Sequence, residues 1–449
     1  MKGIQLEDFN MDFQGEKKLD RTPGLPPRGS PPLGADAMAS AQAGVCFADL
    51  RLTLGKLREL LTSPTPIELK KKNSQEIISG ISTDSRTTKP RELFFALMGP
   101  TFDGHNFLEN AFQKGALAAV VSRPLGQESA KKSRKNLKPL FLVTDTLKAL
   151  GDLARNLRDQ RDLKVLAITG SVGKTTVKEL VSLILGKKDP YLLKTIGNFN
   201  NLIGVPRSIL EGISPRTQNA VLELGANNFG EIKRLTEIVN PSVGLITRVE
   251  RAHLEFFGDL QGVWKAKSEM FWEMSINSTA VINLDDPYLA PWAEKFPGNT
   301  LTFGKDPLAA VRLVNRKPLG VAGEEISLIG PGLSKPIKIH LRLLGEAKVN
   351  CATAAAAAAL AMGAEWSDIA LGLEEARALP GRGETKVSPT GVSIINESYN
   401  ANPGSMEAAL TSLQGLEGGK IAILGDMLEL GTDSPQKHWE LGQFIAKSK

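Results

Sequence analysis

The segment from Lys164 to Leu185 constrains the fold of this chain more than any other part. An apolar run ends at Ile168, a glycine-rich stretch reads Thr169-Gly-Ser-Val-Gly-Lys-Thr-Thr176, and a helical apolar pattern follows from Val177. A strand, a glycine-rich turn and a helix in this order form a phosphate-binding loop, or P-loop. We therefore expect an α/β fold in which this strand lies within a parallel sheet.

The chemistry of the loop points to ATP. Glycines let backbone N–H groups close around phosphate oxygens, and the helix N-terminus adds its positive dipole. Lys174 would reach the β- and γ-phosphates, and Thr175 would be a ligand of Mg²⁺. The loop is shorter than the general pattern, because it begins at Gly170 and Ile168 stands five positions before Gly173. The predicted nucleotide-binding residues here are Gly170, Ser171, Val172, Gly173, Lys174, Thr175 and Thr176.

A P-loop predicts nucleotide binding but does not determine the reaction. The protein could be a kinase, a regulatory GTPase or a ligase on this evidence. A glycine-rich turn with an incidental lysine is disfavoured, since a strand and a helix flank the loop in the required order. The reaction must therefore be inferred from residues elsewhere in the chain.

Changes in pattern along the chain predict three domains after a disordered tail. Residues 1–46 carry Pro, Gly and mixed charges without apolar periodicity, which is typical of disorder. Residues 47–160 read as a small α/β domain, and residues 161–380 alternate apolar strands with helical patterns, as a buried parallel sheet does. The expected central strands are Val165 to Ile168, Ala220 to Leu224, Val243 to Ile246 and Ala280 to Ile282.

Residues 381–449 form the third predicted domain. We expect strands at Val392 to Asn396 and Ile421 to Leu424, joined by a helix from about Pro403 in a parallel, right-handed crossover. The chain stops after a helical pattern from about Pro435 to Ala446, which in a doubly wound fold should lead into another strand. We therefore expect a Rossmann-like C-terminal domain that is truncated.

Composition limits the other classes of function. The formal charge of +6 is carried largely by short runs such as Lys70 to Lys72 and Lys131 to Lys138, which are typical of solvated loops, so no nucleic-acid partner is expected. The longest weakly apolar stretch, Cys351 to Ala364, is too short for a transmembrane segment. The chain has two cysteines, Cys46 and Cys351, which are too few for a disulfide framework and fit a reducing cytoplasm.

Four further segments resemble the Mur ligase family. They are Gly197-Asn-Phe-Asn-Asn-Leu-Ile-Gly-Val-Pro206, Leu222-Glu-Leu-Gly-Ala226, Ala252-His-Leu-Glu255 with Ala266-Lys267, and Ser398-Tyr-Asn-Ala-Asn-Pro403. The resemblance runs from about residue 47 to the end of the chain. It implies a three-domain Mur ligase architecture, with a central P-loop domain and a Rossmann-like C-terminal domain.

The resemblance implies a metal site for Mg²⁺, with two ions expected. Thr175, Glu223, His253 and Lys267 are its expected ligands. Lys267 matches a lysine that many Mur ligases carbamylate with CO₂, although Lys265 lies close by with the same chemistry. The residues alone leave an alternative for each of these ligands. Glu223 could be an exposed glutamate at a strand end, His253 a structural histidine and Lys267 a solvated lysine.

The same resemblance assigns residues to ATP and to the acyl chemistry. Asn283 is expected to contact adenine, although a turn-forming role is the alternative. Arg382 is expected at the phosphates, and Glu397 near the ribose, where the family pattern suggests an aspartate. The expected catalytic residues are Lys174, Lys267, His253 and Arg382.

The resemblance further implies that the substrates are UDP-N-acetylmuramoyl-tripeptide and D-alanyl-D-alanine, which are joined through an acyl phosphate. We expect the protein to be a monomer. Substrate-binding roles fall on Ser82, Asp84, Ser85, Arg86, Asp103 and His105 in the first domain, and on Asn200, Asn201, Tyr399, Asn400 and Asn402. A MurE-like ligase that adds an amino acid, or a ligase similar to folylpolyglutamate synthase, is the alternative on the same scaffold. A P-loop regulatory protein without ligase chemistry is the alternative of another class.

Overall fold

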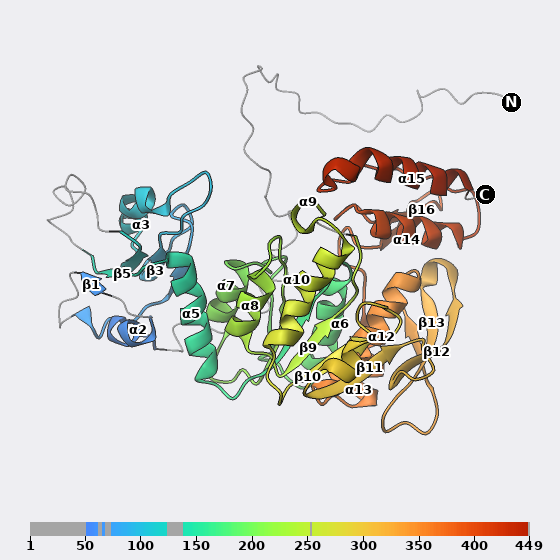
Figure 1. Cartoon of the computed structure of the whole chain (residues 1–449), viewed down its shortest axis with the longest axis horizontal. Coiled ribbons are helices and arrows are strands. Elements are labelled where there is room, and N and C mark those ends of the chain that lie inside the picture. Colours follow the sequence, from blue (N-terminus) through green and yellow to red (C-terminus); the bar gives the residue numbers. More distant parts are fainter. Residues whose placement is uncertain (1–50, 62–64, 68–72, 124–137, 252–253, 448–449) are drawn as a thin grey trace, which may run out of the picture. The chain divides into compact units, whose positions relative to one another are not determined.

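The computed structural model describes residues 51–61, 65–67, 73–123, 138–251 and 254–447 (Figure 1). The predicted tail at residues 1–46 and the candidate ligand His253 lie outside these ranges. All of the described residues belong to one compact unit.

A five-stranded sheet forms the first domain. Its order is β1-β5-β4-β3-β2, in which β2 to β5 are parallel and β1 runs antiparallel to β5. The apolar strands β3 and β4 and the helix α2 agree with the small α/β domain predicted for residues 47–160. The elements are α2 (Leu54–Leu60), β1 (Thr65–Ile67), β2 (Gly80–Ser82), β3 (Glu92–Phe95), η4 (Gly104–Phe107), α3 (Leu108–Gln113), β4 (Ala118–Val121), β5 (Leu140–Leu142) and α5 (Thr146–Asp159).

The second sheet has nine strands in the order β14-β13-β12-β11-β10-β9-β6-β8-β7. Strands β6 to β12 are paired in parallel, as the sequence predicts, whereas β12, β13 and β14 form an antiparallel extension that the sequence analysis did not anticipate. The strands are β6 (Lys164–Thr169), β7 (Leu193–Lys194), β8 (Asn219–Glu223), β9 (Val243–Ile246), β10 (Thr279–Asn283), β11 (Asn299–Gly304), β12 (Val311–Pro318), β13 (Glu324–Ile329) and β14 (Ile337–Leu341).

Helices cover both faces of this sheet, and the alternation of side chains along each strand decides which face each residue reaches. Val165 and Ala167 of β6 pack with α7, α8 and α10, whereas Leu166 and Ile168 pack with α6, α12 and α13. Because both faces are buried, the strands read as continuous apolar runs. The helices are α6 (Lys174–Gly186), α7 (Gly204–Gly212), α8 (Glu231–Val239), α9 (Leu254–Phe257), α10 (Leu260–Glu273), α11 (Trp292–Lys295), α12 (Glu346–Ala361) and α13 (Trp366–Glu375).

The alanine-rich segment noted in the sequence is the buried helix α12. Ala355 to Ala359 are fully buried, and the helix packs against α6 and against β10, β11 and β12. Alanine side chains allow the two helix backbones to approach closely, so α12 can carry its N-terminal residues up to the P-loop. No helix in the described part of the chain is long and apolar enough to cross a membrane.

The third segment departs from the prediction. Strand β16 (Ser393–Asn396) pairs antiparallel with β15 (Glu384–Val387), and α14 (Pro403–Gln414) and α15 (Ser434–Lys447) follow. The predicted strand Ile421 to Leu424 is wrong, as is the parallel crossover that depended on it. Ile421 and Ile423 are 87% and 96% exposed, and no described strand pairs with this run, so its apolar character alone does not make it a strand.

We expect Ala356→Leu to destabilise the protein by about 1–3 kcal/mol, because the added methyl groups have no space between α12 and its neighbours. The measurement is the free energy of unfolding in urea. Ala361→Leu, at a half-buried position of the same helix, is the matched control and should cost less. Equal losses for the two variants would contradict the tight packing described above.

Candidate functional site

The site is a cavity of about 610 Å³ at the carboxyl edge of the nine-stranded sheet. The P-loop follows β6, Glu223 ends β8, Thr247 follows β9 and Asn283 ends β10, and all four line the cavity. These strands are neighbours in the order β10-β9-β6-β8, and parallel pairing places their carboxyl ends side by side. The sheet therefore gathers residues that lie more than 100 positions apart in the sequence.

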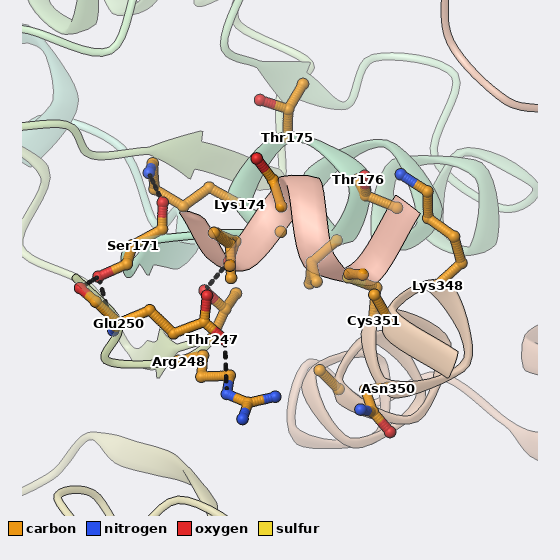
Figure 2. A pocket seen from close by; sticks show the side chains of 18 of the residues that line it. Ser171, Lys174, Thr175, Thr176, Thr247, Arg248, Glu250, Lys348, Asn350 and Cys351 are labelled. Atoms are coloured by element: carbon orange, nitrogen blue, oxygen red, sulfur yellow. Dashed lines mark hydrogen bonds and ion pairs between the residues drawn. The ribbon is translucent and has the colours of Figure 1, made fainter. Parts of the chain in front are cut away.

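Hydrogen bonds to the segment after β9 hold the P-loop in shape. Ser171 Oγ donates to the Glu250 carbonyl (2.9 Å) and accepts from the Glu250 N–H (3.0 Å). Thr247 Oγ1 donates to the Val172 carbonyl at 2.6 Å. Figure 2 shows Ser171, Thr247 and Glu250 grouped together near Lys174. The loop is thus preorganised by its own protein neighbours.

Two glycines of the loop are required by the backbone. Gly170 has φ +137°, and a Cβ there would lie 2.1 Å from Thr247 Oγ1. Gly173 has φ +84° at the N-cap of α6, and a Cβ there would lie 2.9 Å from Cys351 Sγ. Residues with a side chain rarely adopt such φ values, so the shape of the loop depends on glycine.

The Lys174 side chain lies along the P-loop. Its Nζ donates to the carbonyls of Gly170 (2.7 Å) and Ser171 (3.2 Å). Burial lowers the pKa of Lys174, the negative charge of Glu223 raises it, and the positive charge of Arg382 lowers it. These electrostatic effects indicate that the three side chains share one site, although Arg382 comes from the third segment.

Glu223 offers an oxygen suited to a cation. Its side chain is 2% exposed, and Oε1 accepts from Asn200 Nδ2 at 2.8 Å. Oε2 is buried and has no hydrogen-bond partner among the described residues. A buried carboxylate oxygen without a partner is costly, so this oxygen fits a ligand for a metal ion.

The structure describes only part of the predicted metal site. Thr175 lines the cavity with Glu223, whereas His253 lies outside the described residues. Within the described ranges there is no group of three His, Cys, Asp or Glu side chains that could hold a metal by themselves. The remaining predicted ligand, Lys267, is not such a residue unless its amine is modified.

Lys267 is buried on α10 and does not line the cavity itself. It is 2% exposed, and its Nζ lies 5.4 Å from the centre of the Phe257 ring. The pKa of Lys267 is lowered to about 7, mainly by burial and also by the charge of Lys174, against the opposing effects of Glu231 and Glu269. Lys265 is exposed to solvent. The expected distinction between the two lysines is therefore visible in their burial.

The Asn283 side chain forms hydrogen bonds with backbone groups of the surrounding loops. Its Nδ2 donates to the Thr247 carbonyl (3.1 Å), and its Oδ1 accepts from the Asp285 N–H (3.0 Å). This is the turn-forming role named as the alternative from the sequence, and the residue also lines the cavity. A nucleotide contact stays a prediction.

The third segment contributes Arg382, Glu397, Tyr399, Asn400 and Asn402 to the cavity wall. The Arg382 guanidinium lies over the Tyr399 ring, 3.6 Å from its centre. Such stacking orients a guanidinium while leaving its N–H groups free for other partners.

Two of the predicted substrate residues in this segment accept hydrogen bonds from nearby backbone N–H groups. Asn402 caps α14 by accepting from the Ser405 N–H at 2.9 Å. Asn400 Oδ1 accepts from the Ala401 N–H at 2.9 Å. Similarly, Asn201 Oδ1 accepts from the N–H groups of Ile203 and Gly204 at the start of α7. These bonds shape the loops that carry the predicted contacts.

The predicted substrate residues of the first domain do not line the cavity. Asp84 pairs with the exposed Arg86 at 2.7 Å, while Ser82 and Ser85 are buried. His105 Nδ1 lies 2.6 Å from Asp103 Oδ1, and its Nε2 accepts from the Ser122 N–H. Both ring nitrogens of His105 are therefore engaged within the protein, which indicates that His105 shapes its loop.

Sequence reasoning missed several residues of the cavity wall. Arg248 and Glu250 follow β9, and their position after a parallel strand was a usable signal. Arg248 Nε pairs with Glu250 Oε1 at 2.9 Å. Lys348 and Cys351 come from α12, and no local pattern in the sequence predicts their approach to the P-loop (Figure 2).

Family models match three parts of the chain. The Mur ligase family catalytic domain matches residues 77–158, the Mur ligase middle domain matches residues 168–359, and the Mur ligase glutamate ligase domain matches residues 381–449. The UDP-N-acetylmuramoyl-tripeptide–D-alanyl-D-alanine ligase of Haemophilus influenzae is 38% identical over 374 residues, covering 82% of this chain and 78% of that protein. The chain belongs to the Mur ligase family. The enzyme of the same name from Escherichia coli is 36% identical, covering 88% of this chain and 83% of that one.

Solved Mur ligases share this fold. A crystal structure of MurF from Acinetobacter baumannii has a TM-score of 0.79 at 35% identity, covering 88% of this chain and 83% of that one. A MurF ligase from Thermotoga maritima in complex with ADP has a TM-score of 0.73 at 28% identity, covering 82% of each chain. The α/β, three-domain Mur ligase fold expected from the sequence is therefore confirmed.

We expect Gly173→Ala to weaken ADP binding at least tenfold, because the left-handed φ and the contact with Cys351 both oppose a Cβ. Gly186→Ala on the same helix is the control, since its Cβ would meet nothing within 4 Å. Calorimetric titration with ADP measures both variants. Binding by Gly173→Ala at the level of the control would contradict the account of the loop.

Proposed function

We propose that this chain is an ATP-dependent ligase that joins D-alanyl-D-alanine to UDP-N-acetylmuramoyl-tripeptide in peptidoglycan precursor synthesis. The observation that carries the proposal is a single cavity lined by the P-loop, Glu223 and the stacked Arg382. The relatives named for this reaction support the choice of substrates, since they match most of the chain at 34–38% identity.

In the first step, the terminal carboxylate of the tripeptide attacks the γ-phosphorus of ATP. A P–O bond forms to the carboxylate, the bond to the β-phosphate oxygen breaks, and ADP leaves with that electron pair. Negative charges must approach each other, so the ammonium of Lys174 and the guanidinium of Arg382 would hold the phosphate oxygens and offset the repulsion. Backbone N–H groups of the P-loop would orient the same phosphates.

In the second step, the amine of D-alanyl-D-alanine attacks the carbonyl carbon of the acyl phosphate. A C–N bond forms, the C–O bond to phosphate breaks, and the amine loses a proton as phosphate leaves. An acyl phosphate is already activated, so the protein's main task is to hold the two reactants together. Tyr399, Asn400 and Asn402 are the residues we propose for the dipeptide, and Asn200 and Asn201 for the neighbouring end of the tripeptide.

Magnesium fits the donor set of this site. Glu223 Oε2 and the Thr175 hydroxyl would hold it, with His253 as a further ligand that lies outside the described residues. When bound, Mg²⁺ supplies charge neutralisation at the phosphates. We propose two ions, as in the sequence-based expectation.

We propose that Lys267 carries a carbamate. An unprotonated amine adds to CO₂, forming an N–C bond and releasing one proton, and the product is an anionic group like a carboxylate. Burial supports this reaction because it lowers the pKa of Lys267 to about 7, which leaves a large share of the amine unprotonated near neutral pH. The carbamate would add an oxygen-bearing ligand for the metal, supplied by α10, to those of Thr175 and Glu223.

The first domain is proposed to bind the UDP-sugar end through the loops of Ser82 to Arg86 and Asp103 to His105. The domain boundaries 47–160, 161–380 and 381–449 stay part of this proposal, as do ATP contacts from Asn283 and Glu397. We also propose that the protein acts as a monomer in the cytoplasm, where ATP and nucleotide-linked precursors are available.

Mass spectrometry of the products tests the reaction. With ATP, Mg²⁺, UDP-N-acetylmuramoyl-tripeptide and D-alanyl-D-alanine, we expect the tripeptide to gain the mass of the dipeptide minus one water. Parallel reactions with single amino acids or with glutamate test the MurE-like and folylpolyglutamate-type alternatives. A Lys174→Ala variant should form no product. Product only with a single amino acid, or ATP hydrolysis without any amide product, would overturn the proposal.

We expect Lys267→Ala to lower the ligation rate at least 100-fold and Lys265→Ala to lower it less than threefold, because only Lys267 is buried beside the site. The measurement is phosphate release at saturating substrates. A reversed order of the two effects would show that the other lysine belongs to the site.

Carbon-13 bicarbonate tests the modification separately. We expect a carbamate carbon signal in the NMR spectrum of the parent protein that is absent from Lys267→Ala. A parent spectrum without this signal would exclude the carbamate and leave the role of Lys267 to its amine.

A further inference from the structure

A second buried lysine, Lys178, lies one helical turn after Lys174 on α6 and is only 1% exposed. Its Nζ donates to the Thr195 carbonyl at 3.1 Å and to the Gly197 carbonyl at 3.2 Å, and it pairs with Glu179 Oε1 at 2.9 Å. An ammonium has three N–H donors, and each has an acceptor here. The cation is therefore fully partnered inside the protein.

These partners connect two separate parts of the chain. Lys178 belongs to the helix that begins at the P-loop, whereas Thr195 and Gly197 follow β7 and lead into the loop that carries Asn200. Gly197 has φ +53°, and its carbonyl is one of the two that Lys178 holds. Removing the ammonium would leave both carbonyls without this partner and free the start of the loop.

The loop in turn holds Glu223 at two points. Thr195 is fully buried, and its Oγ1 accepts from the Glu223 N–H at 2.8 Å. Asn200 Nδ2 donates to Glu223 Oε1 at 2.8 Å, and the Asn200 carbonyl accepts from the Gly225 N–H at 2.7 Å. The backbone and the carboxylate of Glu223 are thus both fixed by the segment that Lys178 anchors.

We propose that Lys178 is a positioning residue for the metal site: it sets the place of the Glu223 carboxylate relative to Thr175 by tying the 195–200 segment to α6. Thr175 and Lys178 share one turn of the same helix, so the position of Lys178 is coupled rigidly to that of Thr175. This inference rests on the proposed roles of Glu223 and Thr175 as Mg²⁺ ligands. Lys178 touches neither the nucleotide site nor the metal in this account and acts through Thr195 and Asn200.

The test is the Mg²⁺ dependence of ADP binding by Lys178→Met, which keeps the length of the side chain and removes its charge and donors. Calorimetric titrations with ADP are made without metal and at increasing Mg²⁺ concentrations. We expect metal-free binding to change less than twofold, and the Mg²⁺ concentration for half-maximal tightening to rise about tenfold, as is typical when an outer partner of a metal ligand is lost.

Lys187→Met is the matched control, because Lys187 follows the last turn of α6 and pairs with Glu375 at the surface. It should leave both titrations unchanged. Lys178→Gln is a second, polar variant, used under the same criterion if Lys178→Met does not fold. The double variant Lys178→Met with Asn200→Ala tests whether the two residues act together. Its Mg²⁺ concentration for half-maximal tightening should rise by less than the product of the two single-variant fold-changes, because both residues act on Glu223.

A buried lysine with only a structural role gives a different result. It would lower the thermal stability of the variants and leave the Mg²⁺ dependence equal to that of Lys187→Met, and this outcome would overturn the proposal. The readout requires no ligation, so failure to form the amide product would refute the proposed reaction without deciding the role of Lys178. If ADP binding by the parent protein did not depend on Mg²⁺, the metal site itself would be refuted, and the proposed role of Lys178 with it.

Discussion

The site depends on the parallel pairing of β8, β6, β9 and β10. In this arrangement, each strand ends at the same edge of the sheet, so the P-loop, Glu223, Thr247 and Asn283 converge without any close spacing in the sequence. The pairing requires both faces of the sheet to be covered, and the two helix layers provide this cover. The position of the phosphate loop is therefore a consequence of core packing, and the hydrogen bonds to the segment after β9 refine it.

Lys178, Lys267 and Glu223 are buried ionisable groups around this edge, and each is accommodated differently. The ammonium of Lys178 has an acceptor for every donor, which offsets the cost of removing it from water. Burial lowers the pKa of Lys267, so its charged form is weakly held. Glu223 keeps one carboxylate oxygen without a partner among the described residues. The first is suited to structure and positioning, and the other two to chemistry with a ligand.

The third segment meets the central sheet through polar contacts at the cavity. Lys348 of α12 pairs with Glu397 at 3.4 Å, and Gly404 at the start of α14 approaches the Glu250 carboxylate so closely that a Cβ would lie 2.3 Å from it. Arg382 stacks on Tyr399 in the wall of the same cavity. Charged contacts of this kind contribute little stability but fix orientation, which would suit the role proposed for Arg382 at the phosphates.

The sequence by itself determined the P-loop, the central strands and the family, because these features are local: a run of glycines before a helix, or an apolar strand buried on both faces, is recognisable within about ten residues. The family resemblance favoured Lys267 over Lys265, and Lys267 is the buried one of the two, but its role stays a prediction. It failed at Ile421 to Leu424, since an apolar run becomes a strand only where a neighbouring strand supplies hydrogen bonds. Only the tertiary structure decided that Lys348 and Cys351 of α12 reach the P-loop, and that Lys178 holds the segment supporting Glu223. These contacts join residues far apart in the chain, and their geometry follows from how helices and strands pack rather than from any local pattern.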